Sequence, residues 1–172
     1  MTMRHLHQTP ERTPRDRLAE RVRTASYGSV LVLAALSVVG VSDVALGHGA
    51  ELVAGVGVAT WVAHLFAELL AGHVQRREPL ERNEVIRAAV DGSPIIASTV
   101  LPATVLLFGR LDLMTDSAAR IVAIVVAVLQ LFSIGVFVAR VAPMRAGATW
   151  MFAGIMAGIG IVVVVLTVWL GH

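Results

Sequence analysis

The stretch Trp61-Val62-Ala63-His64-Leu65-Phe66-Ala67-Glu68-Leu69-Leu70-Ala71-Gly72-His73 lies within one of several long apolar runs in this chain. It places a histidine and a carboxylate four residues apart in a segment long enough to cross a bilayer. Ionisable side chains are expensive at membrane depth and usually serve a function there. The stretch therefore predicts a membrane-spanning helix that carries a polar site.

The composition indicates that most of the chain is surrounded by lipid. Of its 172 residues, 56% are hydrophobic and 15% are charged, whereas soluble domains have about 45–50% apolar and about 25% charged residues. The absence of cysteine excludes disulfides, zinc–thiolate sites and thiol catalysis. All 14 basic residues are arginines, scattered between the apolar runs. This pattern is typical of membrane flanks, so we expect the lipid bilayer as a partner and no nucleic acid.

Five apolar runs predict an all-α, polytopic membrane protein. They cover about 26–47, 52–74, 86–108, 118–141 and 146–170, and each exceeds the roughly 20 residues that a span needs. The short turn between the first two makes them antiparallel neighbours, and Pro79 should break the chain before the third. The third contains Pro94 and Pro102, which neighbouring helices can accommodate. A re-entrant third segment, leaving four spans, is the alternative.

The chain before the first span divides the sequence into two parts. Residues 1–24 form a polar tail, and residues 25–172 form the five-helix membrane domain. The sequence Thr13-Pro14-Arg15-Asp16 predicts a helix start, with a threonine cap, proline in the first turn and an early acid. We expect this helix to be amphipathic, to skim the headgroups and to run on into the membrane. The long polar stretch does not resemble a signal peptide.

The arginines predict the orientation of the spans. With a cytoplasmic N-terminus, twelve arginines are cytoplasmic and only Arg110 and Arg120 lie outside. The twelve are Arg4, Arg12, Arg15, Arg17, Arg21, Arg23, Arg76, Arg77, Arg82, Arg87, Arg140 and Arg145. This is a strong positive-inside signal. It predicts a multi-pass protein of a cell membrane, such as a bacterial inner membrane.

Small residues predict where helices pack closely. Gly55, Ala59, Ala63, Ala67 and Ala71 follow one another at four-residue spacing, and this series is called the small-residue ridge below. The last span contains a GxxxG pattern at Gly154 and Gly158. Such faces allow backbones to approach closely, either within one chain or across a dimer. We predict a homodimer.

The polar stripe Thr60, His64 and Glu68 is the candidate site. It follows one helical face beside the small-residue ridge, so we expect it to face protein. At 1.5 Å per residue, Glu68 lies roughly 9 Å and His64 roughly 15 Å from the cytoplasmic end of the span. Asp91, on the next and antiparallel segment, falls at about the depth of Glu68.

His64, Glu68 and Asp91 are therefore the predicted ligands of a metal ion. Imidazole with carboxylates suits a divalent transition metal such as Fe²⁺, Mn²⁺ or Zn²⁺, and the same groups suit a proton relay. A buried His–Glu pair that fixes helix register is the structural alternative. Asp91 could equally cap a new helix at Asp91-Gly92-Ser93-Pro94.

Other polar residues in or near the spans have simpler interpretations. Asp43, His48 and Glu51 suit a solvated outer rim, and Gln130 and Ser133 can form hydrogen bonds between helices. The sequence contains no phosphate-binding loop, nucleophile elbow or zincin motif. We therefore predict no enzyme activity, no catalytic residue and no bound cofactor.

Three stretches resemble the vacuolar iron transporter family. They are Tyr27-Gly28 before the first span, His64 through Glu68, and the run from Leu131 through Gly147. The resemblance implies five membrane helices, a cytoplasmic N-terminus, a dimer, and exchange of divalent iron or manganese for protons. Glu68 matches the family's metal-binding glutamate, and His64 stands where the family has a methionine ligand. The family's aspartate ligand in the first helix is replaced by Leu31, and its acidic cytoplasmic domain is absent.

These observations leave three functions open. The first is a divalent metal ion/proton exchanger in which Glu68 alternates between proton and metal. The second is a non-transporting interaction or assembly protein, whose His64–Glu68 pair is structural. The third is a proton conductor that uses the same residues without metal.

Overall fold

The computed structural model describes residues 13–76, 82–141 and 146–170, which form seven α-helices and no strand. These residues are 93% helical, which confirms the all-α class. The helices are α1 (Pro14–Val38), α2 (Val41–Leu46), α3 (His48–Arg76), α4 (Arg82–Asp91), α5 (Ser93–Arg110), α6 (Asp116–Val141) and α7 (Ala146–Leu170). Residues 1–12 of the predicted tail, the predicted break at Pro79 and residues 142–145 lie outside the described part.

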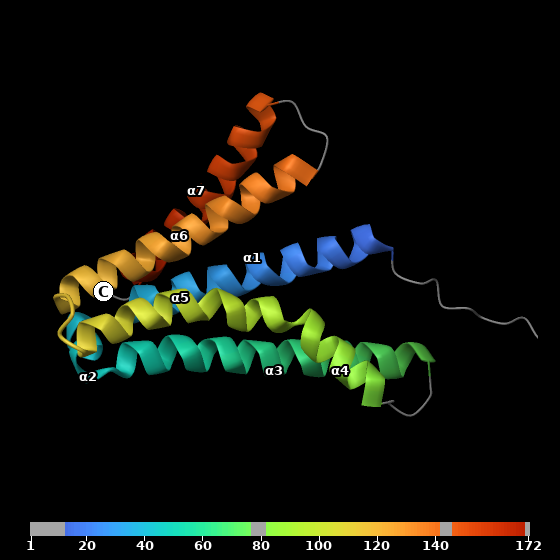
Figure 1. Ribbon diagram of the computed structural model, residues 1–172, viewed down its shortest axis with the longest axis horizontal. Coiled ribbons are helices and arrows are strands. Elements are labelled where there is room, and N and C mark those ends of the chain that lie inside the picture. Colours follow the sequence, from blue (N-terminus) through green and yellow to red (C-terminus); the bar gives the residue numbers. More distant parts are fainter. Residues whose placement is uncertain (1–12, 77–81, 142–145, 171–172) are drawn as a thin grey trace, which may run out of the picture.

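The predicted helix start at Thr13 is confirmed. Pro14 opens α1, and Thr13 and Asp16 form a reciprocal capping box, with Thr13 N–H donating to Asp16 Oδ2 at 2.9 Å. Such a box satisfies amide groups that the first helical turn leaves without partners. α1 then continues without interruption to Val38 and packs against α3, α5, α6 and α7. The residues from Pro14 to Val38, polar at first and then apolar, are therefore one helix (Figure 1).

The segment predicted at about 26–47 is not a single helix. The chain is extended at Val39 and Gly40, and α2 follows. Asp43 Oδ2 accepts a hydrogen bond from Gly40 N–H at 2.7 Å, so Asp43 caps this short helix. Gly47 then adopts φ +82°, a conformation that suits glycine, and α3 begins at the next residue.

The third predicted span also breaks. α4 ends at Asp91 and α5 begins at Ser93 with Pro94 in its first turn. Proline there lacks the amide hydrogen that would continue the first helix, so the chain restarts. A Cβ at Gly92 would lie 3.1 Å from the rings of both Trp61 and His64, so the break packs closely on α3. Trp61 Nε1 fixes it by donating to the Ala89 carbonyl at 3.0 Å.

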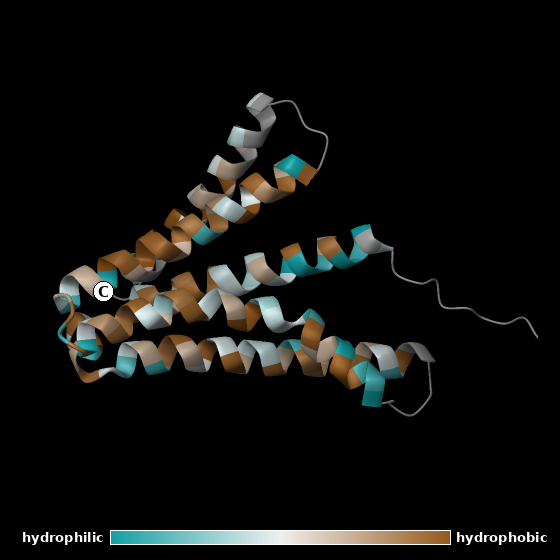
Figure 2. Cartoon of the chain, viewed as in Figure 1, coloured by the Kyte–Doolittle hydropathy of each residue, from teal (hydrophilic) through white to brown (hydrophobic). Residues whose placement is uncertain are grey.

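The chain has the surface of a membrane protein. Among the described residues, three helical stretches are long and apolar enough to cross a bilayer: 48–74, 82–110 (α4 and α5 together) and 116–141. Large apolar side chains also point outward, including Phe66, Leu129 and Trp169, which is 74% exposed. Figure 2 shows hydrophobic residues along the length of the helices. Apolar surface on this scale indicates membrane association.

The small-residue ridge on α3 faces away from the rest of the chain. All five of its residues are exposed, and a Cβ at Gly55 would meet no atom within 4 Å. The buried face of α3 instead contains Val53 and Gly57, and a Cβ at Gly57 would collide with the Thr99 side chain on α5. The close helix contact within the chain is therefore at Gly57, on a different face from the ridge.

Candidate metal site

Three ionisable side chains from two helices meet beside the start of α1. Glu20 of α1 and His64 and Glu68 of α3 each offer one ligand atom, and these atoms all lie within 4.8 Å of one another. All three residues are half-buried. The structure thus brings the two predicted residues of α3 together with a carboxylate from a different helix.

The local structure explains why these groups converge. Residues four apart lie on one face of a helix, and Thr60, His64 and Glu68 are all half-buried on α3, so the stripe faces protein as predicted. α1 packs along this part of α3 and contributes Glu20. One turn further into α1, the buried Thr24 donates its hydroxyl to the Glu20 carbonyl at 2.8 Å. The backbone at Glu20 is therefore fixed by a well-packed helix.

Arg23 supplies the positive charge next to this cluster. Its guanidinium donates a hydrogen bond to the Glu20 carboxylate and lies 3.9 Å from Glu68 Oε1. The hydrogen bond and charge of Glu20, together with the charge of Glu68, raise the pKa of Arg23 above its usual value. Arg23 is thus a permanent cation that partly neutralises the two carboxylates.

His64 has an unused nitrogen. Its Nε2 atom is buried and has no hydrogen-bond partner among the described residues. Leaving a buried polar atom unpaired costs about 1–3 kcal/mol. A neutral imidazole nitrogen is also among the commonest metal ligands in proteins. The site therefore contains a nitrogen that is available as a metal ligand, because no described residue forms a hydrogen bond with it.

Asp91, the third predicted ligand, does not join this cluster of ligand atoms. The prediction placed Asp91 by its depth along a straight helix over 86–108. The helix breaks at Gly92, and α4 runs at an angle to α5 (Figure 1). Asp91 is instead the last residue of α4, next to the glycine that packs against the His64 ring.

Glu20 was missed because the sequence placed it in a polar tail before the membrane. The signal that could have found it is the cap at Thr13, which starts a helix with no break before the apolar run. A continuous helix carries Glu20 alongside the cytoplasmic-facing end predicted for α3. Its pairing with His64 and Glu68 depends on how two helices pack, which spacing within one helix does not reveal.

The donor set suits a borderline divalent metal. One imidazole nitrogen and two carboxylate oxygens resemble the ligand sets that bind zinc, iron and manganese. Three protein ligands leave coordination positions open for water. Such an open site permits exchange of the ion, in contrast to a closed structural site with four protein ligands.

No protein-family model, curated protein or solved structure matches this chain. Its function is therefore argued from its own residues.

Proposed function

We propose that this chain is a multi-pass membrane protein that moves a divalent transition-metal ion, such as Fe²⁺, Mn²⁺ or Zn²⁺, in exchange for protons. The observation that carries the proposal is the convergence of Glu20, His64 and Glu68, with ligand atoms within 4.8 Å of one another. Ionisable groups on a membrane helix rarely persist without a function. Here they are joined by a third from another helix, which a pair serving only to fix register does not require.

The same three groups can bind either protons or a metal ion. Metal binding requires deprotonated carboxylates and a neutral imidazole, so it releases any protons that these groups hold. Protonation conversely removes the ligands and releases the ion. Arg23 must move away when a cation binds, because its guanidinium interacts with both carboxylates. The exposed Arg23 side chain has room to do so.

The proposed topology has five spans with the N-terminus in the cytoplasm. The arrangement of the described arginines supports it. One end of the bundle carries the start of α1, α4 and the end of α6, with Arg15, Arg17, Arg21, Arg23, Arg82, Arg87 and Arg140 (Figure 1). The other end carries the end of α5 and the start of α6, with Arg110 and Arg120. The metal cluster then lies near the cytoplasmic end of α3.

We further propose that two copies associate through the small-residue ridge of α3. The ridge is exposed along its whole length in one chain, and small residues in a membrane allow a second helix to approach closely.

The test is metal flux into proteoliposomes that contain the purified chain. The variants are Glu20→Gln and Glu68→Gln, which remove one ligand charge each and preserve shape. The matched control is Glu51→Gln, because Glu51 lies on the same helix as Glu68 but pairs loosely with Arg110 at the other end of the bundle. We expect uptake of Fe²⁺, Mn²⁺ or Zn²⁺ by the wild type and the control, and at least a tenfold loss in both cluster variants, since losing a charged ligand costs more than about 1.4 kcal/mol.

Two other outcomes separate the alternatives. If no metal moves and Glu68→Gln only lowers the unfolding temperature, the cluster is structural and the protein belongs to an assembly. If protons move in the same vesicles with no metal present, and Glu68→Gln stops them, the chain is a proton conductor. Either result rejects the exchanger.

A further inference from the structure

A pocket, called the cavity below, lies on the opposite face of α1 from Glu20, His64 and Glu68. It is an open pocket with a volume of about 420 Å³, lined by residues of α1, α5 and α6. Glu20 and Ser29 are nine residues apart on α1, which at 100° per residue puts them on opposite sides of the helix. The cavity is therefore distinct from the site of Glu20, His64 and Glu68.

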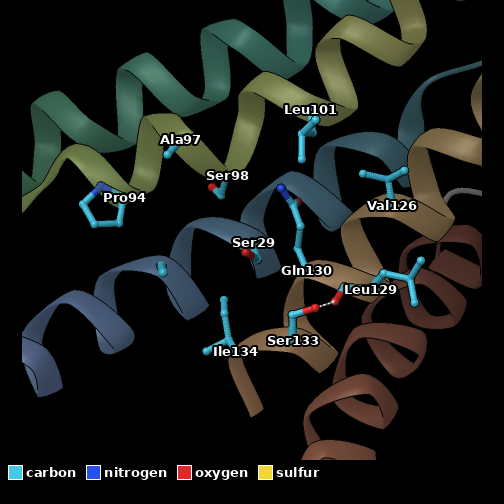
Figure 3. A pocket seen from close by; sticks show the side chains of 11 residues that line it. Ser29, Pro94, Ala97, Ser98, Leu101, Val126, Leu129, Gln130, Ser133 and Ile134 are labelled. Carbon is cyan, nitrogen blue, oxygen red and sulfur yellow. Dashed lines mark hydrogen bonds between the residues drawn. The ribbon is translucent and has the colours of Figure 1, made fainter. Parts of the chain in front are cut away.

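The deep part of this cavity contains polar groups without partners. Ser29 is completely buried, and its Oγ atom has no hydrogen-bond partner among the described residues. Gln130 Oε1 is also buried and unpaired. Figure 3 shows the Gln130 side chain extending from α6 toward α5, with Ser29 of α1 and Ser98 of α5 both to its left in the view. Each such group costs about 1–3 kcal/mol if nothing satisfies it, so these residues are arranged for a partner that the described residues do not supply.

Further oxygen atoms of the lining remain able to accept. The hydroxyls of Ser98 and Ser133 donate to the carbonyls of Ile95 and Leu129, which leaves their own lone pairs available. Pro102 adds to this, because it has no amide hydrogen for the carbonyl of Ser98 one turn earlier. The cavity thus offers several acceptors together with the amide and hydroxyl donors of Gln130 and Ser29.

The lining selects the charge of the ligand. None of the eleven residues around the cavity is charged, and seven are apolar or proline. An ion would lose its water in this setting without gaining a counter-charge, which is costly. A volume of 420 Å³ falls within the range of small-molecule sites, about 300–1,000 Å³. The chemistry therefore favours an uncharged molecule with hydrogen-bonding groups.

An entry route adjoins the cavity. A neighbouring pocket of about 340 Å³ shares Ala25, Pro94, Ser133 and Ile134 with the cavity. It continues along α1 past Val22 to Arg21, toward the beginning of the helix. A molecule can thus reach Ser29 from the end of the bundle that bears the arginines.

We propose that the cavity between α1, α5 and α6 binds a small uncharged molecule carrying amide or hydroxyl groups, held by Ser29 and Gln130. Ser29 and Gln130 supply the unpaired donors and acceptors, and the apolar wall packs around the rest of the ligand. This site does not depend on Glu20, His64 and Glu68, and it would remain if those residues only stabilised the packing of the helices.

The absence of cysteine allows a direct test in the full chain. Ala97→Cys places a thiol in the cavity wall, and Ala54→Cys, exposed on α3 outside the small-residue ridge, is the matched control. The rate of modification by methyl methanethiosulfonate is measured in detergent with increasing glycerol, urea or acetamide. At twice the Kd about one third of sites stay free, so we expect at least one probe to slow labelling of Ala97→Cys roughly threefold and to leave Ala54→Cys unchanged.

The roles of Ser29 and Gln130 in binding are tested in the Ala97→Cys background. Adding Ser29→Ala or Gln130→Leu should restore the rate, and neither should lower the unfolding temperature, because each removes a buried unpaired group. Ala25→Cys is the second reporter if Ala97→Cys does not fold. The proposal is overturned if no probe protects either reporter, if protection survives both substitutions, or if NaCl alone protects as well as the uncharged probes.

Discussion

At the scale of single residues, the candidate metal site is a balance between two carboxylates, an imidazole and a guanidinium. Glu20 and Glu68 both interact with Arg23, and His64 leaves Nε2 free. A cation that binds here gains three ligands but must displace the arginine. The affinity of the site therefore depends on Arg23 as well as on the ligands.

Arg23→Gln should increase metal affinity. The substitution removes a competing charge, and exposed ion pairs of this kind are worth about 0.2–1 kcal/mol, so we expect up to about fivefold tighter binding of Co²⁺ or Mn²⁺. Isothermal titration of the detergent-solubilised chain measures it. Arg17→Gln is the control, because it lowers the net charge equally on an exposed part of α1. Weaker binding by Arg23→Gln would show that Arg23 organises the ligands instead of competing with the metal.

At the scale of helices, glycines two residues apart on α3 have opposite surroundings. Gly57 packs against Thr99 of α5, while Gly55 meets nothing within 4 Å. Gly55→Ala should stabilise the chain by about 0.5–1 kcal/mol, because alanine favours helix. Gly57→Ala should destabilise it by about 1–3 kcal/mol, because Thr99 is buried and must move. Thermal unfolding in detergent compares the two, and equal shifts would mean that α3 and α5 are not packed as described.

Some features of the helices were predictable from the sequence, and others depend on how the helices pack. The capped start of α1 and the stripe on α3 were predictable, because both depend on residues within a few positions of one another. The break at Gly40 interrupts an apolar run, so hydropathy did not reveal it. The restart after Gly92 was one of the two interpretations of Asp91-Gly92-Ser93-Pro94. Glu20 and the exposed ridge depend on which helix faces which, and that information lies in packing between distant segments.

At the scale of the whole molecule, the exposed small-residue ridge predicts where two copies meet. Single cysteines at Ala59, Ala63 or Ala67 should form a disulfide between chains under mild oxidation, since such a bond needs Cα atoms within about 7 Å. Val125→Cys on the exposed face of α6 is the control and should stay reduced. Non-reducing electrophoresis of the oxidised membranes gives the result. Cross-linking at Gly158→Cys with none on α3 would place the interface on α7.

The arginine distribution predicts the orientation of the molecule in its membrane. The starts of α1 and α4 should face the cytoplasm, and the turn between α5 and α6 should face outside. In intact cells, an impermeant maleimide should therefore label Leu113→Cys, whose side chain is 69% exposed in that turn. Ala19→Cys on α1 and Asn83→Cys on α4, both exposed, should react only after the membrane is opened.

The pairing of these three positions makes the outcome decisive. Ala19 and Asn83 share a side only if an even number of membrane crossings separates them, as α1 and α3 provide. Labelling of Asn83→Cys but not Ala19→Cys in intact cells would mean that α1 or α3 does not cross. If Ala19→Cys, Asn83→Cys and Leu113→Cys all required permeabilisation, α5 would enter and leave on the same side. In either case Glu20, His64 and Glu68 would still lie together, but the proposed exchange would need another route for the ion across the bilayer.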